Sequence, residues 1–283
     1  MRSTVFAALI EAAAAWAQAR GLRALAGPYA FSINHEVGLL VSGFDSPSAV
    51  RTPYHPPYYA GHLAALGFRP LKHLVEHRAP IARALAFAAR AEAALARRRG
   101  GQRLAIRPIR RLGYRSGWRA IRAVYDDAWA DNWGSVPVSP EEAAAIALLM
   151  RPLARPGWLA LATLDDRPIG ALAMLPDVNP WLAEAGPRPG AAGWVRFARR
   201  ILFATPQRAR IALIGVVRSQ RDRPAGALAA TALLAHAART AERAGVEEIA
   251  IGWMLEDNRR ILALAEALGG REARRWAVLA KPL

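Results

Sequence analysis

Short apolar runs alternate with longer amphipathic segments over the second half of the chain. Runs without a polar face are typical of strands buried on both sides of a sheet. They cover residues 104–109, 158–164, 168–175, 211–217 and 249–255. Apolar residues three and four positions apart predict helices between these runs. The helical segments cover residues 116–130, 140–151, 226–244 and 258–268. Strands that alternate with helices in this way predict an α/β fold.

The segment from Arg210 to Asn258 forms a strand, an Arg-rich turn, a helix and a second strand. This order predicts a βαβ unit with parallel strands and a right-handed crossover. The turn lies where a helix begins, so free N–H groups and the positive end of the helix dipole point outward there. A phosphate group suits this position. The alternative is an ordinary turn whose arginines serve solubility.

The turn resembles the acetyl-CoA site of the GNAT N-acetyltransferase superfamily. That family places an Arg or Gln, two residues, a Gly, one residue and a Gly or Ala around the CoA pyrophosphate. In one register Arg221 opens the motif and Gly226 closes it, with Pro224 in place of the first Gly. In the other, Arg223 opens it and Leu228 replaces the last small residue. We favour the first register because it keeps the family's distance from the strand end, although Pro224 removes one donor N–H group.

The resemblance implies a set of acetyl-CoA-binding residues. They are Val216, Val217, Arg221, Arg223, Pro224, Gly226, Ala227 and Asn258. The backbone N–H near Val216 would face the developing oxyanion, and Asn258 matches the Asn that opens a helix beside the pantetheine arm. Many members carry a Tyr on that helix to protonate the thiolate, but the matching residue here is Ala265.

Two further roles are assigned by resemblance or by proximity. The loop with Asn132 and Trp133 would close over the acceptor amine, and the alternative for Trp133 is a place in the core. Glu256 is the candidate catalytic base because the strand before the turn carries no carboxylate. The alternative for Glu256 is a helix-capping role beside Asn258.

Residues 1–80 repeat the order of the tail: helix, strand, polar turn, helix, strand. The whole chain resembles a bacterial family with two GNAT-like domains in tandem. We therefore predict a degenerate half GNAT-like domain over residues 1–80, an Arg-rich helical linker on the surface over 81–102, and a GNAT-like domain over 103–283. The fold would be a mixed twisted sheet flanked by helices. The first half would lack a pyrophosphate loop, and its open sheet edge would suit a homodimer contact or another partner.

Composition narrows the partners and the chemistry. The chain has no cysteine, which excludes disulfides and Cys-ligated metals, and we expect no metal site although His73 and His77 share a strand face. A net charge of +17 attracts anions, but the arginines are scattered and accompany no nucleic-acid-binding motif. No apolar run is long enough to span a membrane. We expect a cytoplasmic protein.

These features predict an N-acetyltransferase that moves the acetyl group of acetyl-CoA to a small-molecule or peptide amine. The turn length, Gly226 and Asn258 favour this prediction. Pro224 and Ala265 favour the alternative, a catalytically inactive binding or assembly protein with the same fold, and a nucleic-acid binder is the third candidate. A long insertion over 176–207 contains a basic amphipathic helix, which would act as a lid or contact a membrane surface or a partner.

Overall fold

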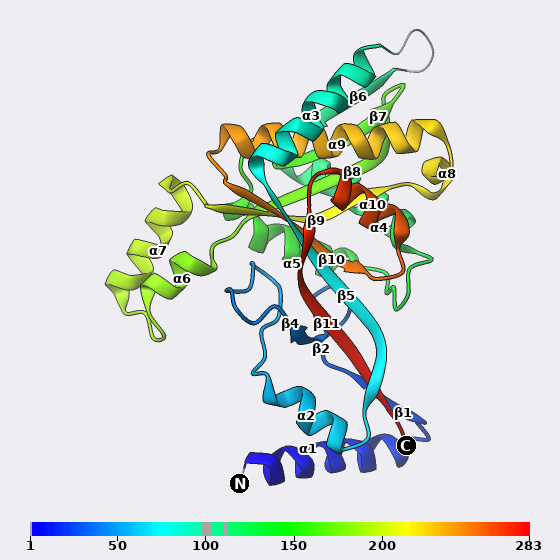
Figure 1. Cartoon of the computed structure of the whole chain (residues 1–283), viewed down its shortest axis with the longest axis vertical. Coiled ribbons are helices and arrows are strands. Elements are labelled where there is room, and N and C mark those ends of the chain that lie inside the picture. Colours follow the sequence, from blue (N-terminus) through cyan, green and yellow to red (C-terminus); the bar gives the residue numbers. More distant parts are fainter. Residues whose placement is uncertain (1, 98–102, 110–112) are drawn as a thin grey trace.

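A single twisted sheet runs through the whole molecule in the computed structural model, which describes residues 2–97, 103–109 and 113–283 (Figure 1). The strand order is β1-β11-β5-β10-β9-β8-β7-β6, and β4 also pairs with β11. The strands are β1 (Ala24–Gly27), β4 (Leu39–Ser42), β5 (Arg69–Pro80), β6 (Leu104–Pro108), β7 (Leu159–Leu164), β8 (Arg167–Pro176), β9 (Arg208–Val216), β10 (Glu248–Leu255) and β11 (Arg271–Pro282). A separate short pair consists of β2 (Tyr29–Ala30) and β3 (Glu36–Val37).

In the second half of the chain, helices lie where the spacing of apolar residues predicted them. The helices are α1 (Arg2–Gln18), α2 (Tyr58–Ala65), α3 (Ile81–Ala96), α4 (Tyr114–Trp129), α5 (Pro140–Met150), α6 (Asn179–Ala185), α7 (Ala191–Phe203), α8 (Arg218–Arg221), α9 (Pro224–Arg243) and α10 (Arg259–Ala267), with a 3-10 turn at Arg151–Leu153. The start of α5 is capped, because the Ser139 side chain accepts a hydrogen bond from the Glu142 N–H at 3.0 Å. Pro224 opens α9 at its first turn.

Two helical layers enclose the upper part of the sheet. Successive side chains of a strand point to opposite faces, and along β7 Ala160 and Ala162 pack in the cluster with α9, whereas Leu159 and Leu161 pack in the cluster with α4. The nearly continuous apolar runs of the sequence follow from this burial on both faces. Among the described strands only β9 and β10 pair in parallel, as the predicted βαβ unit requires.

Helix α3 packs into the core, so the prediction that it lies on the surface was wrong. Its Ala84, Phe87, Ala88 and Ala91 are buried, and the helix packs against α9. Small side chains on both helices allow close approach, so the alanines that suggested a surface position serve packing instead. Residues 98–102, the end of the predicted linker, lie outside the described residues.

The first part of the chain shares its sheet with the rest. Strand β5 inserts between β10 and β11, and β5 and β11 continue together into the lower part of the molecule, where α1 and α2 lie (Figure 1). Strand β1 is at the sheet edge, and β11 is its one partner among the described strands. The domain boundaries at residues 80 and 103 remain a prediction.

Candidate functional site

The parallel strands β9 and β10 separate in the middle of the sheet. Their pairing runs only from Arg208 and Glu248 to Ile211 and Ile251. Beyond that point the two strands diverge, and a cavity of about 1520 Å³ opens between them. Its walls include β9 from Ala212 to Val216 and the end of β10 from Gly252 to Leu255. On the side that faces the cavity, the backbone N–H and C=O groups of these two strand segments therefore have no partner strand among the described residues.

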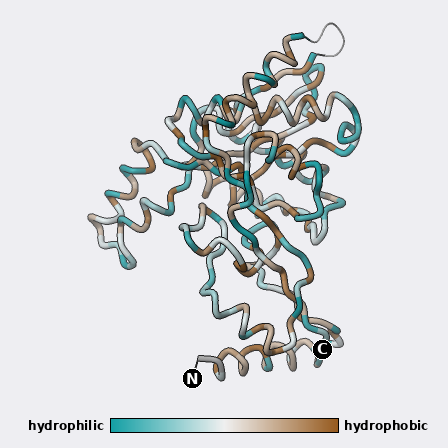
Figure 2. Tube along the Cα trace, viewed as in Figure 1, coloured by the Kyte–Doolittle hydropathy of each residue, from teal (hydrophilic) through white to brown (hydrophobic). Residues whose placement is uncertain are grey.

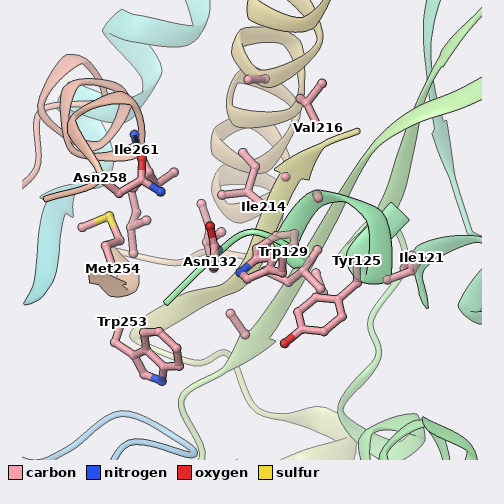
Figure 3. A pocket seen from close by; sticks show the side chains of 18 of the residues that line it. Ile121, Tyr125, Trp129, Asn132, Ile214, Val216, Trp253, Met254, Asn258 and Ile261 are labelled. Carbon is pink, nitrogen blue, oxygen red and sulfur yellow. Dashed lines mark hydrogen bonds between the residues drawn. The ribbon is translucent and has the colours of Figure 1, made fainter. Parts of the chain in front are cut away.

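Side chains from distant parts of the sequence face each other across this cavity (Figure 3). Tyr125, Trp129 and Asn132 come from α4 and the loop after it, and they lie opposite Trp253 and Asn258. Apolar residues form most of the lining, and arginines are the most frequent of its polar residues.

The turn before α9 forms one end of the cavity. Of the predicted CoA-binding residues, those that line it are Val216, Arg221, Arg223, Pro224, Gly226, Ala227 and Asn258. Val217 is absent from the lining: its N–H donates to the Ile169 carbonyl at 2.9 Å, and its side chain packs against the core. A Cβ on Gly226 would lie 2.8 Å from the Gln220 carbonyl carbon and closer still to its oxygen, so this position requires glycine.

The backbone donors of this turn are mostly engaged. Pro224 has no N–H, and the N–H groups of Gly226 and Ala227 donate to the Arg223 carbonyl at 3.0 and 3.3 Å. The Ala225 N–H has no acceptor among the described backbone groups. An anion at this end would therefore depend more on guanidinium groups than on backbone N–H groups.

Arginines surround the turn, but several are already paired. Arg221 donates to the Ala128 carbonyl at 2.6 Å, and Arg260 is bonded to Asp222. In the described part of the chain, Arg223 and Arg259 have no carboxylate within 4.0 Å, and both line the cavity. Beside the turn, these two guanidinium groups are therefore candidates to bind an anion.

Glu256 lies outside the cavity lining. Its two carboxylate oxygens bond to His73 Nδ1 and Arg275 Nη1, each at 2.9 Å. Burial alone would raise the pKa of Glu256, but the bonds and charges of His73 and Arg275 lower it below its usual value. A carboxylate with a lowered pKa is a weak base, so this geometry gives the predicted role no support.

Neighbouring residues of Glu256 have structural roles. The Asn258 side chain accepts a hydrogen bond from the Ile261 N–H at 3.4 Å and caps α10. Ala265, at the position of the family's Tyr, is fully buried in the core, whereas Leu264 lines the cavity. A tyrosine at 265 would therefore point away from a ligand.

The predicted acceptor residues Asn132 and Trp133 both line the cavity. Trp133 also packs against the cluster of Ile33 and Val37. The core-packing alternative for Trp133 is therefore observed, and its contact with a substrate remains a prediction.

The far end of the cavity is closed by a segment that the sequence had not marked as functional. Ile33, Asn34 and His35 line it, although they belong to the first part of the chain. The Tyr125 hydroxyl donates to Asn34 Oδ1 at 2.6 Å, and His35 Nε2 lies 2.9 Å from Glu142 Oε1. Burial, with the nearby Asp126 and Glu142 carboxylates, raises the pKa of Tyr125 to about 12.

A His–Glu pair at a cavity wall can move a proton. A carboxylate only accepts, so the tautomer that bonds to Glu142 has its hydrogen on Nε2, and among the described residues none bonds to Nδ1. No sequence motif could have marked this pair, because its members are 107 positions apart.

Two bacterial proteins and a set of solved structures are similar to this chain. No family model matches the chain. The chain is 27% identical over 282 residues to Protein YghO of Escherichia coli, covering 99% of this chain and 71% of that protein. It is also 27% identical over 281 residues to Bacterial ceramide synthase of Caulobacter vibrioides, covering 99% and 72%.

Among solved structures, a tandem GNAT protein from the clavulanic acid biosynthesis pathway matches with a TM-score of 0.52. The match has 16% sequence identity and covers 97% of this chain and 69% of that one. The chain therefore has the GNAT fold, and the predicted fold class and resemblance are confirmed.

Proposed function

We propose that this chain is an acyl-CoA-dependent N-acyltransferase. The observation that carries the proposal is the cavity between the separated strands β9 and β10, which joins the Arg-rich start of α9 to the His35–Glu142 pair. One end offers positive charge for a phosphate-bearing donor, and the other offers a base. Exposed backbone groups of β9 lie between them, where a thioester carbonyl would find hydrogen-bond donors.

At the donor end, Arg223 and Arg259 would hold the CoA phosphates. This assignment follows from the loss of the backbone donor at Pro224 and from the absence of a carboxylate partner for either arginine in the described residues. Guanidinium groups bind phosphate through paired N–H donors. The predicted contribution of Arg221 would be indirect, because it ties the turn to α4.

At the acceptor end, His35 would accept the proton of the attacking amine. The C–N bond of the amide forms, the C–S bond of the thioester breaks, and the amine proton passes to Nδ1 while Glu142 stabilises the resulting imidazolium. General bases of this kind contribute about 10²- to 10⁴-fold to rate. Tyr125 would position the segment through its bond to Asn34.

The acceptor we propose is the amine of a long-chain lipid. The cavity volume of about 1520 Å³ exceeds the roughly 1,000 Å³ upper range of ordinary ligand pockets. Its aromatic walls suit an alkyl chain, and one relative is a ceramide synthase, whose product is the amide of a long-chain amine. We extend the donor from acetyl-CoA to acyl-CoA in general for the same reason.

The test is a turnover assay with acetyl-, octanoyl- and palmitoyl-CoA and sphinganine as the acceptor probe, followed by mass spectrometry of the amide. We expect amide formation that falls by about 100-fold or more in His35→Gln. Arg223→Gln with Arg259→Gln would weaken acyl-CoA binding in calorimetry and leave the pH profile unchanged. His62→Gln, at a half-buried position of α2 outside the cavity lining, is the matched control with wild-type turnover.

Absence of binding of every acyl-CoA at about millimolar concentration would overturn the enzyme proposal. The alternative that Pro224 favours, a non-catalytic GNAT-fold binding protein, would then take its place. Binding without turnover in wild type, unchanged by His35→Gln, would support the same alternative.

A further inference from the structure

Helices α6 and α7 form a hairpin that projects from the side of the molecule (Figure 1). One face of α7 is fixed to the body: Phe197 and Ile201 pack on the cluster around Trp181, and Arg155 Nη2 donates to the Ala204 carbonyl at 2.7 Å. The orientation of the helix is therefore set by packing, and its opposite face points outward.

The outward side of α7 carries large apolar residues. Trp194 is 53% exposed, Val195 62%, Leu202 64% and Phe203 82%. Single exposed apolar residues are common on protein surfaces, but a concentration on one short helix marks an interaction site. In Figure 2 hydrophobic and hydrophilic segments follow one another along this hairpin.

The same hairpin is strongly basic. Between residues 185 and 203 the sequence has no Asp or Glu and four arginines, Arg188, Arg196, Arg199 and Arg200. Arg200 pairs with Glu184 at 2.9 Å, whereas Arg196 and Arg199 have no acidic partner within 4.0 Å in the part of the chain that the structure describes. Together with Val195 and Phe203, the arginines border a shallow hollow of about 550 Å³.

We propose that the outward face of α7 docks on the surface of a bilayer that contains anionic lipids. Arginines beside exposed Trp, Phe and Leu are typical of helices that lie in the membrane interface, where apolar side chains enter the acyl region and cations meet the headgroups. No helix of the described residues is long and apolar enough to cross a membrane.

Charge and composition favour an anionic membrane as the partner of this face over a second copy of the chain or a nucleic acid. A second copy of the chain would place arginines against arginines, which repel. A nucleic acid would meet the arginines but leave Leu202 and Phe203 without an apolar partner. The inference is independent of acyl transfer, because vesicle binding needs no substrate.

The experiment measures binding of the whole chain to vesicles of phosphatidylcholine alone and of phosphatidylcholine mixed with phosphatidylglycerol, by co-sedimentation at low and high salt. We expect binding to the anionic vesicles only, weakened by salt. Arg196→Gln with Arg199→Gln should reduce the affinity by roughly 20- to 30-fold. Leu202→Ser with Phe203→Ser should reduce it by on the order of tenfold.

The matched control is Val5→Ala with Leu9→Ala on α1, whose side chains are 61% and 66% exposed. This control should bind like wild type, and thermal melts should show that all variants fold. Wild-type binding by both α7 variants, an equal loss in the control, or no binding to anionic vesicles would overturn the proposal. A dimer in sedimentation velocity that the α7 variants convert to monomer would assign the face to a second copy instead.

Discussion

Replacing Gly226 by alanine tests how the turn before α9 is built. The new Cβ would lie 2.8 Å from the Gln220 carbonyl carbon and closer to the oxygen, whereas Cβ contacts under 3.0 Å are essentially never seen. The Gln220 carbonyl has to move by roughly 1 Å, and strain of this kind typically costs about 1–3 kcal/mol. Alanine recovers about 0.5–1 kcal/mol of helix propensity, so we expect a net loss near ~1–2 kcal/mol.

Thermal unfolding followed by circular dichroism measures this loss. A destabilisation of that size lowers Tm by roughly 2–8 °C in a chain of this length. The matched control is Gly61→Ala in α2, where a Cβ meets no atom within 4 Å, so alanine should stabilise the protein by about 0.5–1 kcal/mol. The two substitutions should therefore change the stability of the protein in opposite directions.

The same variant tests the site. Movement of the Gln220 carbonyl shifts the start of α9, so acyl-CoA affinity should fall by at least about tenfold, while Gly61→Ala leaves it unchanged. A Gly226→Ala protein that melts at or above the wild-type temperature would refute the packing argument.

Two further predictions concern buried charges. Arg274→Ala removes a fully buried guanidinium that bonds to Ser48 Oγ at 2.6 Å, and it should lower the free energy of unfolding in urea by about 3–5 kcal/mol. The control Arg271→Ala, at an exposed position, should change that free energy by no more than about 0.5 kcal/mol. Equal effects of the two variants would contradict a stabilising role of the buried charge. Burial lowers the pKa of His55, His77 and His236 below 6.5, so the unfolded state binds more protons and stability should fall as the pH drops below about 6.5. His236→Gln retains an N–H for the Gly157 carbonyl and should make the loss of stability at low pH smaller. An unchanged pH dependence would contradict the role of His236 in it.

The sequence determined the elements whose signals are local. The apolar runs of β7 and β8 and the helical spacing of α4 and α5 depend on neighbouring residues, so periodicity located them. The turn that follows β9 was also found from the chain alone, because its motif is contiguous.

Only the tertiary structure decided which distant segments meet. The insertion of β5 between β10 and β11 and the burial of α3 against α9 depend on edges and faces that several segments could have occupied. The pairing of His35 with Glu142 joins residues 107 positions apart, and Glu256 is removed from the cavity by His73 and Arg275. Such contacts arise from long-range packing, which leaves no periodic trace in the chain, and for this reason the proposed base could be identified only from the folded protein.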